Sequence, residues 1–455
     1  MHSCDLTQAF TQSDDLKPDA NLYITPPPGW DSPPGTVWKL VKPLYGLAIA
    51  PKAWSDTLKN WIYSYGFKSV NKSDTFFVLN TADGKQMHLV FHVDDLLFNF
   101  SHEELGTDFK KALLTRFDGA DMGPVSRFVG VDIKRDARHT HITQLPLTEN
   151  LLAEYELDDC NAVKTPMMPG TLLTKHVDGE PDCEITDHFV ERYHHLVGTL
   201  LYLCTWTRPD LVFATNQLAK FSHDPHQKHM DAARRVLRYL KGTKEMGITY
   251  TQSDQDPNRL IGFADADWAA CTETRRSVSG FVCLLNGGAV QWRSRQQMSV
   301  ATSTSEAEWV AASRAADELV WLGRVMAEAG FPQATPTPLY EDNRSCRMMS
   351  ENPVANDRSK HIDYRVHALR ERVQDGHVRL LDCPTYDMLA DPFTKALDAV
   401  AFARFRDIFM GINLHTAPPI TTDLNRAGPR TFAPRDPAAP RPTSKWAFPT
   451  PFYTF

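Results

Sequence analysis

Two short apolar runs rich in Val, Leu and Phe flank a pair of acids in residues 87–100, a pattern typical of buried strands. Adjacent residues of a strand point to opposite faces, so Asp94 and Asp95 would not share a site from the middle of one strand. A tight turn here would place both carboxylates at the tip of a hairpin. The pattern alone leaves open whether this tip is a plain polar turn or holds a cation such as Mg²⁺.

Apolar residues spaced three and four positions apart predict two helices before residue 256. Trp54, Leu58 and Trp61 share one face of the first helix. The second covers residues 231–241, and its apolar stripe consists of Ala233, Val236, Leu237 and Leu240. The basic residues of this helix fall mostly off the stripe, and a solvated face or contact with nucleic-acid phosphates explains them about equally well. They are Arg234, Arg235, Arg238 and Lys241.

The region from residue 256 onward has the clearest alternation of strand and helix patterns. Residues 260–267 predict a strand that carries Asp265 and Asp267 on one face. Asn286-Gly287-Gly288 predicts a tight hairpin turn between two further strands. A long helix is expected from residue 305 to about 328, where Gly330 ends it. Strands and helices then alternate to about residue 381, so we expect a mixed α/β sheet.

Composition and charge are those of an ordinary globular protein of 455 residues, with 42% hydrophobic and 23% charged residues and a net charge of −7. The 8 cysteines are scattered without a CxxC pair, which indicates reduced thiols rather than a zinc or redox motif. No signal peptide or 18-residue apolar run is visible. We therefore expect an intracellular protein, cytoplasmic or nuclear, that is neither secreted nor attached to a membrane.

Three histidines in the run SHDPHQKH raise the question of a metal site. His223, His226 and His229 would be spread around a helix, and no cysteine or acid follows them as a partner. The pattern favours surface histidines.

Several ordered motifs resemble those of copia-type LTR retrotransposon polyproteins, in the reverse transcriptase and ribonuclease H region. LYGLAIAPKAW (residues 44–54) is similar to the family's LYGLKQAPRAW, and VDD at 93–95 to its YVDD. YHHLVGTLLYLCTWTRPD (193–210) and VLRYLKGT (236–243) match further blocks. The resemblance extends over residues 3–412.

For the first part of the chain, the resemblance implies a polymerase palm with three catalytic, metal-binding carboxylates at Asp5, Asp94 and Asp95. Two Mg²⁺ ions would be held there, with Mn²⁺ as a possible substitute. Phe10 matches the aromatic residue that excludes a nucleotide 2′-hydroxyl, although a core side chain is the simpler reading of Phe10 alone. Gly46, in the second motif, is implied as a further substrate-binding residue.

Three departures from the family pattern predict that the polymerase half is impaired. Ala48-Ile49 stands where the family has Lys-Gln, and His92 replaces the tyrosine before VDD. The fingers and the strands that would precede Asp5 are also not seen before Met1, which suggests an N-terminally truncated element. Misplaced ligands are costly in rate, so little polymerisation is expected.

The last region resembles the ribonuclease H domain that ends copia-type polyproteins. FADADW (263–268), STSEAE (303–308), LYEDN (339–343) and LADPFTK (389–395) match its blocks. The implied catalytic and metal-binding acids are Asp265, Glu308, Asp342 and Asp391, around two Mg²⁺ ions that activate water.

Two residues near these motifs have alternative roles. Ser305-x-x-Glu308 is also a capping box, which would make Glu308 a helix-end acceptor and leave Glu306 as the fallback ligand. His361 contacts substrate in one reading and caps the next helix in the other.

The combined expectation is an α/β protein with an α+β palm remnant at residues 1–105 and a thumb- or connection-like region at 106–255. A ribonuclease H-like mixed α/β sheet domain would follow at 256–412, and a disordered Pro-rich tail at 413–455. The expected partners are RNA–DNA hybrid, template–primer and other retroelement polyprotein products. The alternative is a catalytically inactive remnant that only binds nucleic acid. A small-molecule phosphohydrolase is disfavoured, because no glycine-rich phosphate loop is present.

Overall fold

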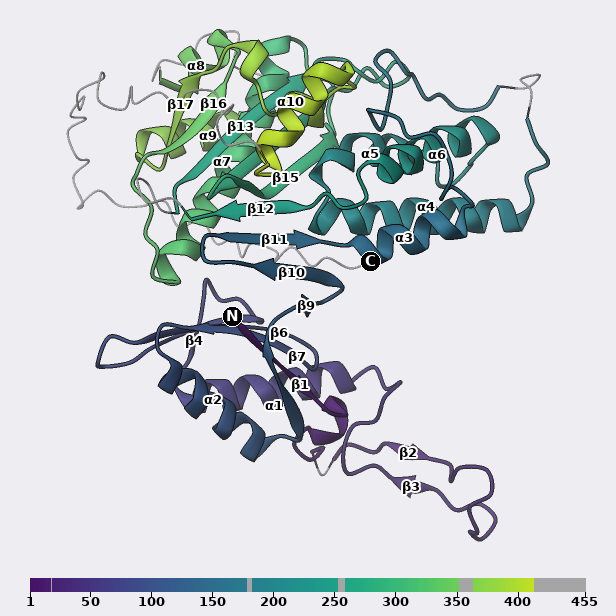
Figure 1. Ribbon diagram of the computed structural model, residues 1–455, viewed down its shortest axis with the longest axis vertical. Helices are drawn as coiled ribbons and strands as arrows, with labels where there is room; N and C mark the ends of the chain where they lie inside the picture. Colours follow the sequence, from purple (N-terminus) through teal and green to yellow (C-terminus); the bar gives the residue numbers. More distant parts are fainter. Residues whose placement is uncertain (18, 178–181, 253–257, 352–362, 413–455) are drawn as a thin grey trace. The chain divides into compact units, whose positions relative to one another are not determined.

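The structure is a computed structural model that describes the chain except residues 18, 178–181, 253–257, 352–362 and 413–455 (Figure 1). The expected disordered tail and His361 therefore lie outside the described residues. The described part consists of a six-stranded, a four-stranded, a five-stranded and a small two-stranded sheet with their helices.

The first sheet is antiparallel and has the strand order β4-β5-β6-β7-β1-β8. Its strands are β1 (His2–Leu6), β4 (Lys68–Ser69), β5 (Phe76–Asn80), β6 (Gln86–His92), β7 (Asp95–Phe100) and β8 (Gly119–Pro124). The predicted pair of strands around the adjacent acids is confirmed as β6 and β7.

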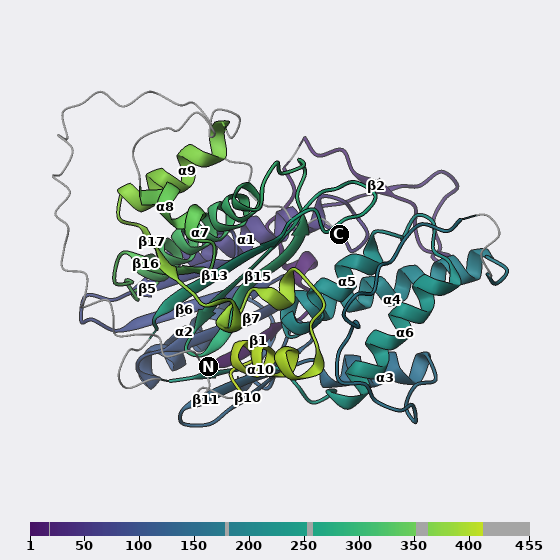
Figure 2. The ribbon, with the colours of Figure 1, turned by 90° about the horizontal axis from the view of Figure 1, so that it is seen from above.

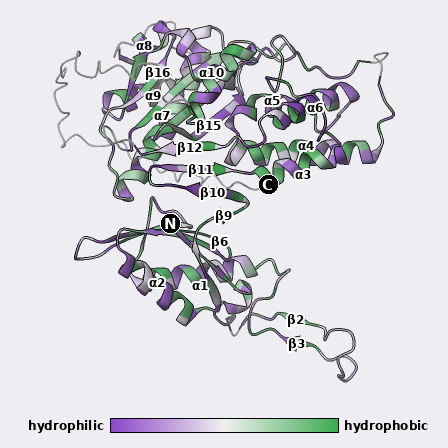
Figure 3. Ribbon diagram, viewed as in Figure 1, coloured by the Kyte–Doolittle hydropathy of each residue, from purple (hydrophilic) through white to green (hydrophobic). Residues whose placement is uncertain are grey.

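Helices α1 (Ala50–Tyr65) and α2 (Glu103–Arg116) lie on the same face of this sheet (Figure 1). The predicted stripe of α1 is confirmed, since Trp54 and Leu58 are buried in the core and Trp61 packs against it. Hydrophobic and hydrophilic stretches interleave along both helices (Figure 3), as expected when one face meets a sheet. The short helix η1 (Ala9–Gln12) follows β1, and β2 (Tyr23–Ile24) pairs with β3 (Trp38–Lys39).

The second sheet is a smaller antiparallel one with the order β12-β11-β10-β9. Its strands are β9 (Arg127–Phe128), β10 (Val131–Arg135), β11 (His139–Thr143) and β12 (Ile248–Thr251). Between β11 and β12 the chain forms helices α3 (Leu145–Glu154), α4 (Asp187–Trp206), η2 (Pro209–Leu211), α5 (Val212–Ala219) and α6 (Gln227–Gly242).

The predicted stripe of α6 is confirmed, because all four of its apolar residues are buried. Two of its basic residues bind the chain itself: Arg235 Nη2 is 3.1 Å from Thr165 Oγ1 and Arg238 Nε is 2.9 Å from the Asn161 carbonyl. These two guanidinium groups therefore hold the segment between α3 and α4. Arg234 is exposed, so both a solvated side chain and contact with nucleic-acid phosphates stay open for it.

The third sheet has the order β15-β14-β13-β16-β17 and is mixed, as predicted. β13 pairs antiparallel with β14 and parallel with β16, and β16 pairs parallel with β17. The strands are β13 (Leu260–Asp267), β14 (Val278–Leu285), β15 (Gly288–Gln296), β16 (Thr337–Glu341) and β17 (Val378–Asp382). The hairpin between β14 and β15 is confirmed, with Asn286 at φ 50° and Gly287 at φ 82°.

One long helix, α7 (Thr304–Glu328), packs on β13, β14 and β16 and buries Trp309, Ala312 and Leu319 in the core (Figures 1 and 2). Gly330 follows it at φ 94°, as expected for the residue that ends a helix. The remaining helices are α8 (Arg344–Glu351), α9 (Asp363–Gln374), η4 (Thr385–Asp387), η5 (Asp391–Phe393) and α10 (Ala399–Phe409).

The predicted boundary between residues 105 and 106 falls inside α2, and β8 still belongs to the first sheet. The expected first region is therefore too short: β8 pairs with β1, and this long-range pairing leaves no local sign in the sequence. The boundary at 255/256 falls in a stretch outside the described residues. All eight cysteines are free, and no described helix has the length and apolar character that a membrane span requires.

Candidate functional site

Four carboxylates that are far apart in sequence come together beside the central strand of the third sheet. Asp265 lies near the end of β13, Glu308 at the start of the second turn of α7, and Asp342 directly after β16. Ligand oxygens of these three residues all lie within 4.8 Å of one another. The fourth, Asp391, begins η5, and Lys395 Nζ lies within 4.0 Å of both Asp391 and Asp265. The sheet and its helices thus bring together all four acids expected in this region.

A glycine makes room for the fourth acid's segment. Gly280 on β14 is directly opposite Asp265 on β13. A Cβ at Gly280 would lie 2.7 Å from Phe393 Cβ and from Thr394 Cγ2. Any larger residue would therefore push η5 and the segment after it away from the sheet, and Asp391 with them.

Burial and mutual repulsion raise the pKa values of these acids. Asp265, Glu308 and Asp391 are each less than a tenth exposed. Burial is the largest cause of the raised pKa of Glu308, and the charges of Glu341, Asp265 and Asp342 add to it. Burial followed by the charge of Asp265 raises the pKa of Asp391, and burial also raises the pKa of Asp342.

Three neighbouring side chains orient the carboxylates. Lys395 Nζ lies 2.9 Å from Asp391 Oδ1 and 4.0 Å from Asp265 Oδ2. The Thr394 hydroxyl donates to Asp265, and the Thr385 hydroxyl donates to Asp342 over 2.9 Å. One lysine faces this group of four carboxylates, so it offsets their mutual repulsion only in part.

A fifth acid, Glu341, was not predicted. It is fully buried at the end of β16, and its Oε1 accepts from the backbone N–H of Asn343. Burial raises its pKa well above the ordinary value. The sequence contains one indication that Glu341 belongs to the cluster: it ends the apolar run 338–341 and precedes Asp342. An acid at the end of a strand is ordinarily solvated, however, so this indication is weak.

Capping of α7 is the role of Glu306 rather than of Glu308. Ser303 is the N-cap and accepts from the backbone N–H of Glu306. The carboxylate of Glu306 in turn accepts from the N–H and hydroxyl of Thr302, at 2.6 and 2.7 Å. The alternative in which Ser305 and Glu308 form the capping box is therefore wrong, because the helix begins one residue earlier than expected.

The donor set fits a hard divalent cation. Every candidate ligand is a carboxylate oxygen, the type preferred by Mg²⁺ and Mn²⁺. Glu308 Oε2 and Glu341 Oε2 are buried and have no hydrogen-bond partner among the described residues. A buried anionic oxygen without a partner is costly, and a bound cation would remove that cost.

In the first sheet, the palm acids lie at adjoining strand ends. Asp94 occupies the turn after Val93, which has a φ of 56°, whereas Asp95 is the first residue of β7. Asp5 on β1 is directly opposite Asp95, so their side chains share one face of the sheet. The expected hairpin tip therefore holds one of the two adjacent acids, and the other belongs to the strand.

The turn is held from two sides, and the acids influence one another. The Leu6 N–H donates to the Asp94 carbonyl over 3.0 Å, and the Trp54 indole donates to the Val93 carbonyl over 2.6 Å. Burial raises the pKa of Asp95, and the charges of Asp94 and Asp5 raise it further. As described, however, Asp5, Asp94 and Asp95 do not form a group with all ligand atoms within 4.8 Å.

The residues of the first two palm motifs lie in different environments. Phe10 packs partly into the core, with its ring centroid 4.5 Å from that of Tyr45. Gly46, at φ 89°, sits in the loop that leads to α1. Ile49 precedes that helix and is 42% exposed, so this surface position carries an apolar side chain.

The histidine prediction was wrong for two of the three residues. His229 is fully buried, and His226 is only partly exposed and contacts the carboxylates of Asp182 and Asp224. Only His223 is an exposed histidine as expected. Asp182 lies 44 residues before His226, so a search for partners that follow the histidines could not find it.

Comparison with known proteins shows which family the chain is similar to. The model of the reverse transcriptase (RNA-dependent DNA polymerase) family matches residues 1–169. The retrovirus-related Pol polyprotein from transposon RE1 of Arabidopsis thaliana is 33% identical over 404 residues, 88% of this chain. The chain belongs to the reverse transcriptase family of copia-type retrotransposon Pol polyproteins.

Other members are similarly close. The Pol polyprotein from transposon RE2 of Arabidopsis thaliana is 34% identical over 84% of this chain, and that from transposon TNT 1-94 of Nicotiana tabacum 30% identical over 89%. The chain spans 26–30% of the length of these Pol polyproteins. A solved foamy viral protease–reverse transcriptase in complex with double-stranded DNA is 9% identical and aligns with a TM-score of only 0.21, over 84% of this chain and 58% of that one.

Proposed function

We propose that this copia-type chain hydrolyses the RNA strand of an RNA–DNA hybrid at Asp265, Glu308, Asp342 and Asp391, and that its polymerase half is impaired. The observation that supports the hydrolase proposal is the convergence of four acids from four separate elements. Three of them are buried, and burying several carboxylates together is unfavourable unless cations compensate for the charge. A group of buried carboxylates is therefore typical of a site that binds metal ions for catalysis.

The protein's own residues would hold and orient the reacting groups. Asp265 lies at the centre of the cluster, with its position set by β13 and the Thr394 hydroxyl. Lys395 orients Asp391 and offsets part of the negative charge. Two divalent ions, Mg²⁺ or Mn²⁺, would supply Lewis acidity at the scissile phosphate and a water nucleophile at neutral pH.

A hollow beside the acids offers space for the sugar–phosphate backbone. Its volume is about 680 Å³, and its lining includes Thr385, Tyr386, Asp391 and Arg404. Tyr386 is 68% exposed, and the guanidinium of Arg404 lies 5.9 Å from the centre of its ring. Arg404 is itself paired with Asp387, so the exposed ring of Tyr386 is the group that suits a sugar or base here. A-form hybrid is expected to be read by shape.

The proposal is tested by offering the purified chain an RNA–DNA hybrid with labelled RNA in Mg²⁺. We expect the RNA to be cut and double-stranded DNA to be left intact. Glu308→Gln removes a proposed ligand charge and is expected to lower the rate at least about a hundredfold. Glu306→Gln, two residues away, keeps a carbonyl oxygen for capping and is expected to retain activity.

Two results would count against this assignment. Intact hybrid RNA in both Mg²⁺ and Mn²⁺, with a folded wild-type protein, would support the alternative of a remnant that only binds nucleic acid. Equal loss of activity in the Glu306 and Glu308 variants would indicate that the start of α7 matters for stability rather than through the carboxylate at 308.

The impaired polymerase half gives a separate prediction. Ile49 has no polar group to contact template or nucleotide, and His92 replaces the tyrosine that usually precedes the acids. We therefore expect no measurable primer extension on a primed RNA template. Efficient nucleotide incorporation that disappears in Asp94→Asn would show instead that the palm is active.

A further inference from the structure

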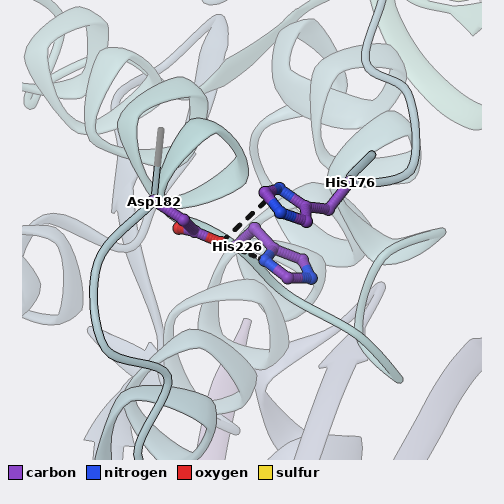
Figure 4. A group of neighbouring side chains, drawn as sticks. All are labelled: His176, Asp182 and His226. Atoms are coloured by element: carbon purple, nitrogen blue, oxygen red, sulfur yellow. Dashed lines mark hydrogen bonds and ion pairs between the residues drawn. The ribbon is translucent and has the colours of Figure 1, made fainter. Parts of the chain in front are cut away.

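A second group of metal-type side chains lies outside both acid clusters. Ligand atoms of His176, Asp182 and His226 all lie within 4.8 Å of one another. His176 and Asp182 belong to the segment between α3 and α4, whereas His226 is the N-cap of α6. Figure 4 shows both imidazole rings facing the carboxylate of Asp182. These side chains are 19%, 15% and 14% exposed, so they are shielded but accessible to a small ion.

The two oxygens of the Asp182 carboxylate have different partners: one accepts from backbone N–H groups and the other contacts the histidines. Its Oδ1 accepts from the backbone N–H groups of Cys183 and Gln227, at 2.8 and 3.0 Å. Its Oδ2 contacts His226 Nδ1 and lies 3.6 Å from His176 Nδ1. One oxygen is therefore fixed by the backbone while the other meets both imidazoles.

His226 is held from its far side by another carboxylate. Its Nε2 lies 3.2 Å from Asp224 Oδ1 while its Nδ1 faces Asp182. Metal-binding histidines usually make this kind of contact, because a carboxylate on the remote nitrogen sets the tautomer and increases the basicity of the binding nitrogen. This contact is independent of the three-residue cluster itself.

Both Nδ1 atoms face the same oxygen of Asp182, and the planes of the two imidazole rings are nearly parallel. The rings of His176 and His226 are stacked, with centroids 4.2 Å apart and an interplanar angle of 8°. His229 supports this geometry without belonging to the cluster. Its Nδ1 accepts from the His226 N–H, and its Nε2 contacts the Thr174 carbonyl, two residues before His176.

We propose that His176, Asp182 and His226 bind one transition-metal ion of the zinc class, which joins the segment before α4 to the start of α6. Two imidazoles and one carboxylate suit Zn²⁺ or Co²⁺ and disfavour Mg²⁺, which prefers an all-oxygen shell. In a tetrahedral site with bonds of about 2.0–2.2 Å, ligand atoms are roughly 3.3–3.5 Å apart. The His176–Asp182 separation is close to this value. To admit the ion, His226 would turn out of its stack on His176 and away from Asp182, and water would take the fourth position.

Binding of Zn²⁺ to the full chain tests the site directly. The titration is followed by calorimetry in excess Mg²⁺, which is added to compete with Zn²⁺ for the oxygen-only acid clusters. We expect one Zn²⁺ to bind, and we expect His176→Ala and Asp182→Asn each to weaken its affinity at least about tenfold. His223→Ala is the matched control, because His223 is an exposed histidine of the same run and lies outside the cluster.

Thermal unfolding separates a lost ligand from a damaged fold. Wild type and variants are expected to share one midpoint in a chelator, and Zn²⁺ is expected to raise the midpoint of wild type and His223→Ala only. The proposal is overturned if wild-type protein binds no Zn²⁺ under these conditions, or if the cluster variants bind it as tightly as wild type. Either result would leave the three residues as a hydrogen-bonded group that fixes the segment without metal.

Discussion

Asp265→Asn is expected to abolish Mg²⁺-dependent cleavage of hybrid RNA, with a loss larger than the approximately 10- to 100-fold typical of residues that only support metal ligands. Asp265 is the acid common to the cluster, since its charge contributes to the raised pKa values of Glu308, Asp342 and Asp391. Asparagine keeps the shape and an acceptor for Thr394 but removes the charge. The rate of RNA cleavage in the full chain is the measurement.

The unfolding midpoint of the Asp265→Asn protein shows whether its loss of activity comes from a lost carboxylate or from a damaged fold. Removing one of several mutually repelling, buried carboxylates is expected to leave the unfolding midpoint unchanged or to raise it, while activity is lost. Asp382→Asn is a suitable control, because Asp382 ends β17 in the same sheet with a side chain that is 68% exposed. An active Asp265→Asn protein, or an Asp382→Asn protein that is equally inactive, would contradict the assignment.

The second large effect concerns a buried ion pair among the helices that follow β11. Arg208 and Asp210 are almost completely buried and form two hydrogen bonds, from Nε to Oδ1 at 2.9 Å and from Nη2 to Oδ2 at 2.8 Å. The Tyr239 hydroxyl donates to Asp210, and Arg208 also donates to the carbonyl and hydroxyl oxygens of Thr243. Burial alone would raise the pKa of Asp210, but the charge and hydrogen bonds of Arg208 and the bond from Tyr239 hold it below the ordinary value.

Asp210→Ala is therefore expected to destabilise the fold by about 3–5 kcal/mol, because it leaves the guanidinium of Arg208 buried without its counter-charge. The free energy of unfolding is measured by urea denaturation, with the helical circular dichroism signal as the probe. Lys244→Ala breaks an exposed pair with Glu149, in which the side chains are 41% and 48% exposed, and is expected to cost at most about 1 kcal/mol. Similar changes in the free energy of unfolding for the two variants would show that the buried pair stabilises the fold no more than the exposed pair does.

Local patterns in the sequence were sufficient for many of the elements. Alternation and turn chemistry located β6, β7, β13 and the β14–β15 hairpin, and the apolar stripes indicated the helices α1, α6 and α7. These features depend on neighbours two to four positions away, which a linear reading contains. The four acids of the third sheet were named from family motifs, and the sheet places them together.

Only the tertiary structure decided which side chains lie together in one cluster. Glu306 and Glu308 are indistinguishable as motif letters, but the start of α7 at Thr304 turns one toward the cap and the other into the cluster. Gly280 matters because η5 packs against it, and His226 finds Asp182 through the folding of a segment more than forty residues away. The sequence by itself determined the elements and the family, because periodicity and motifs are local. The tertiary structure decided which acids and histidines come together, because carboxylates and imidazoles from distant segments meet only after the sheets and helices have packed.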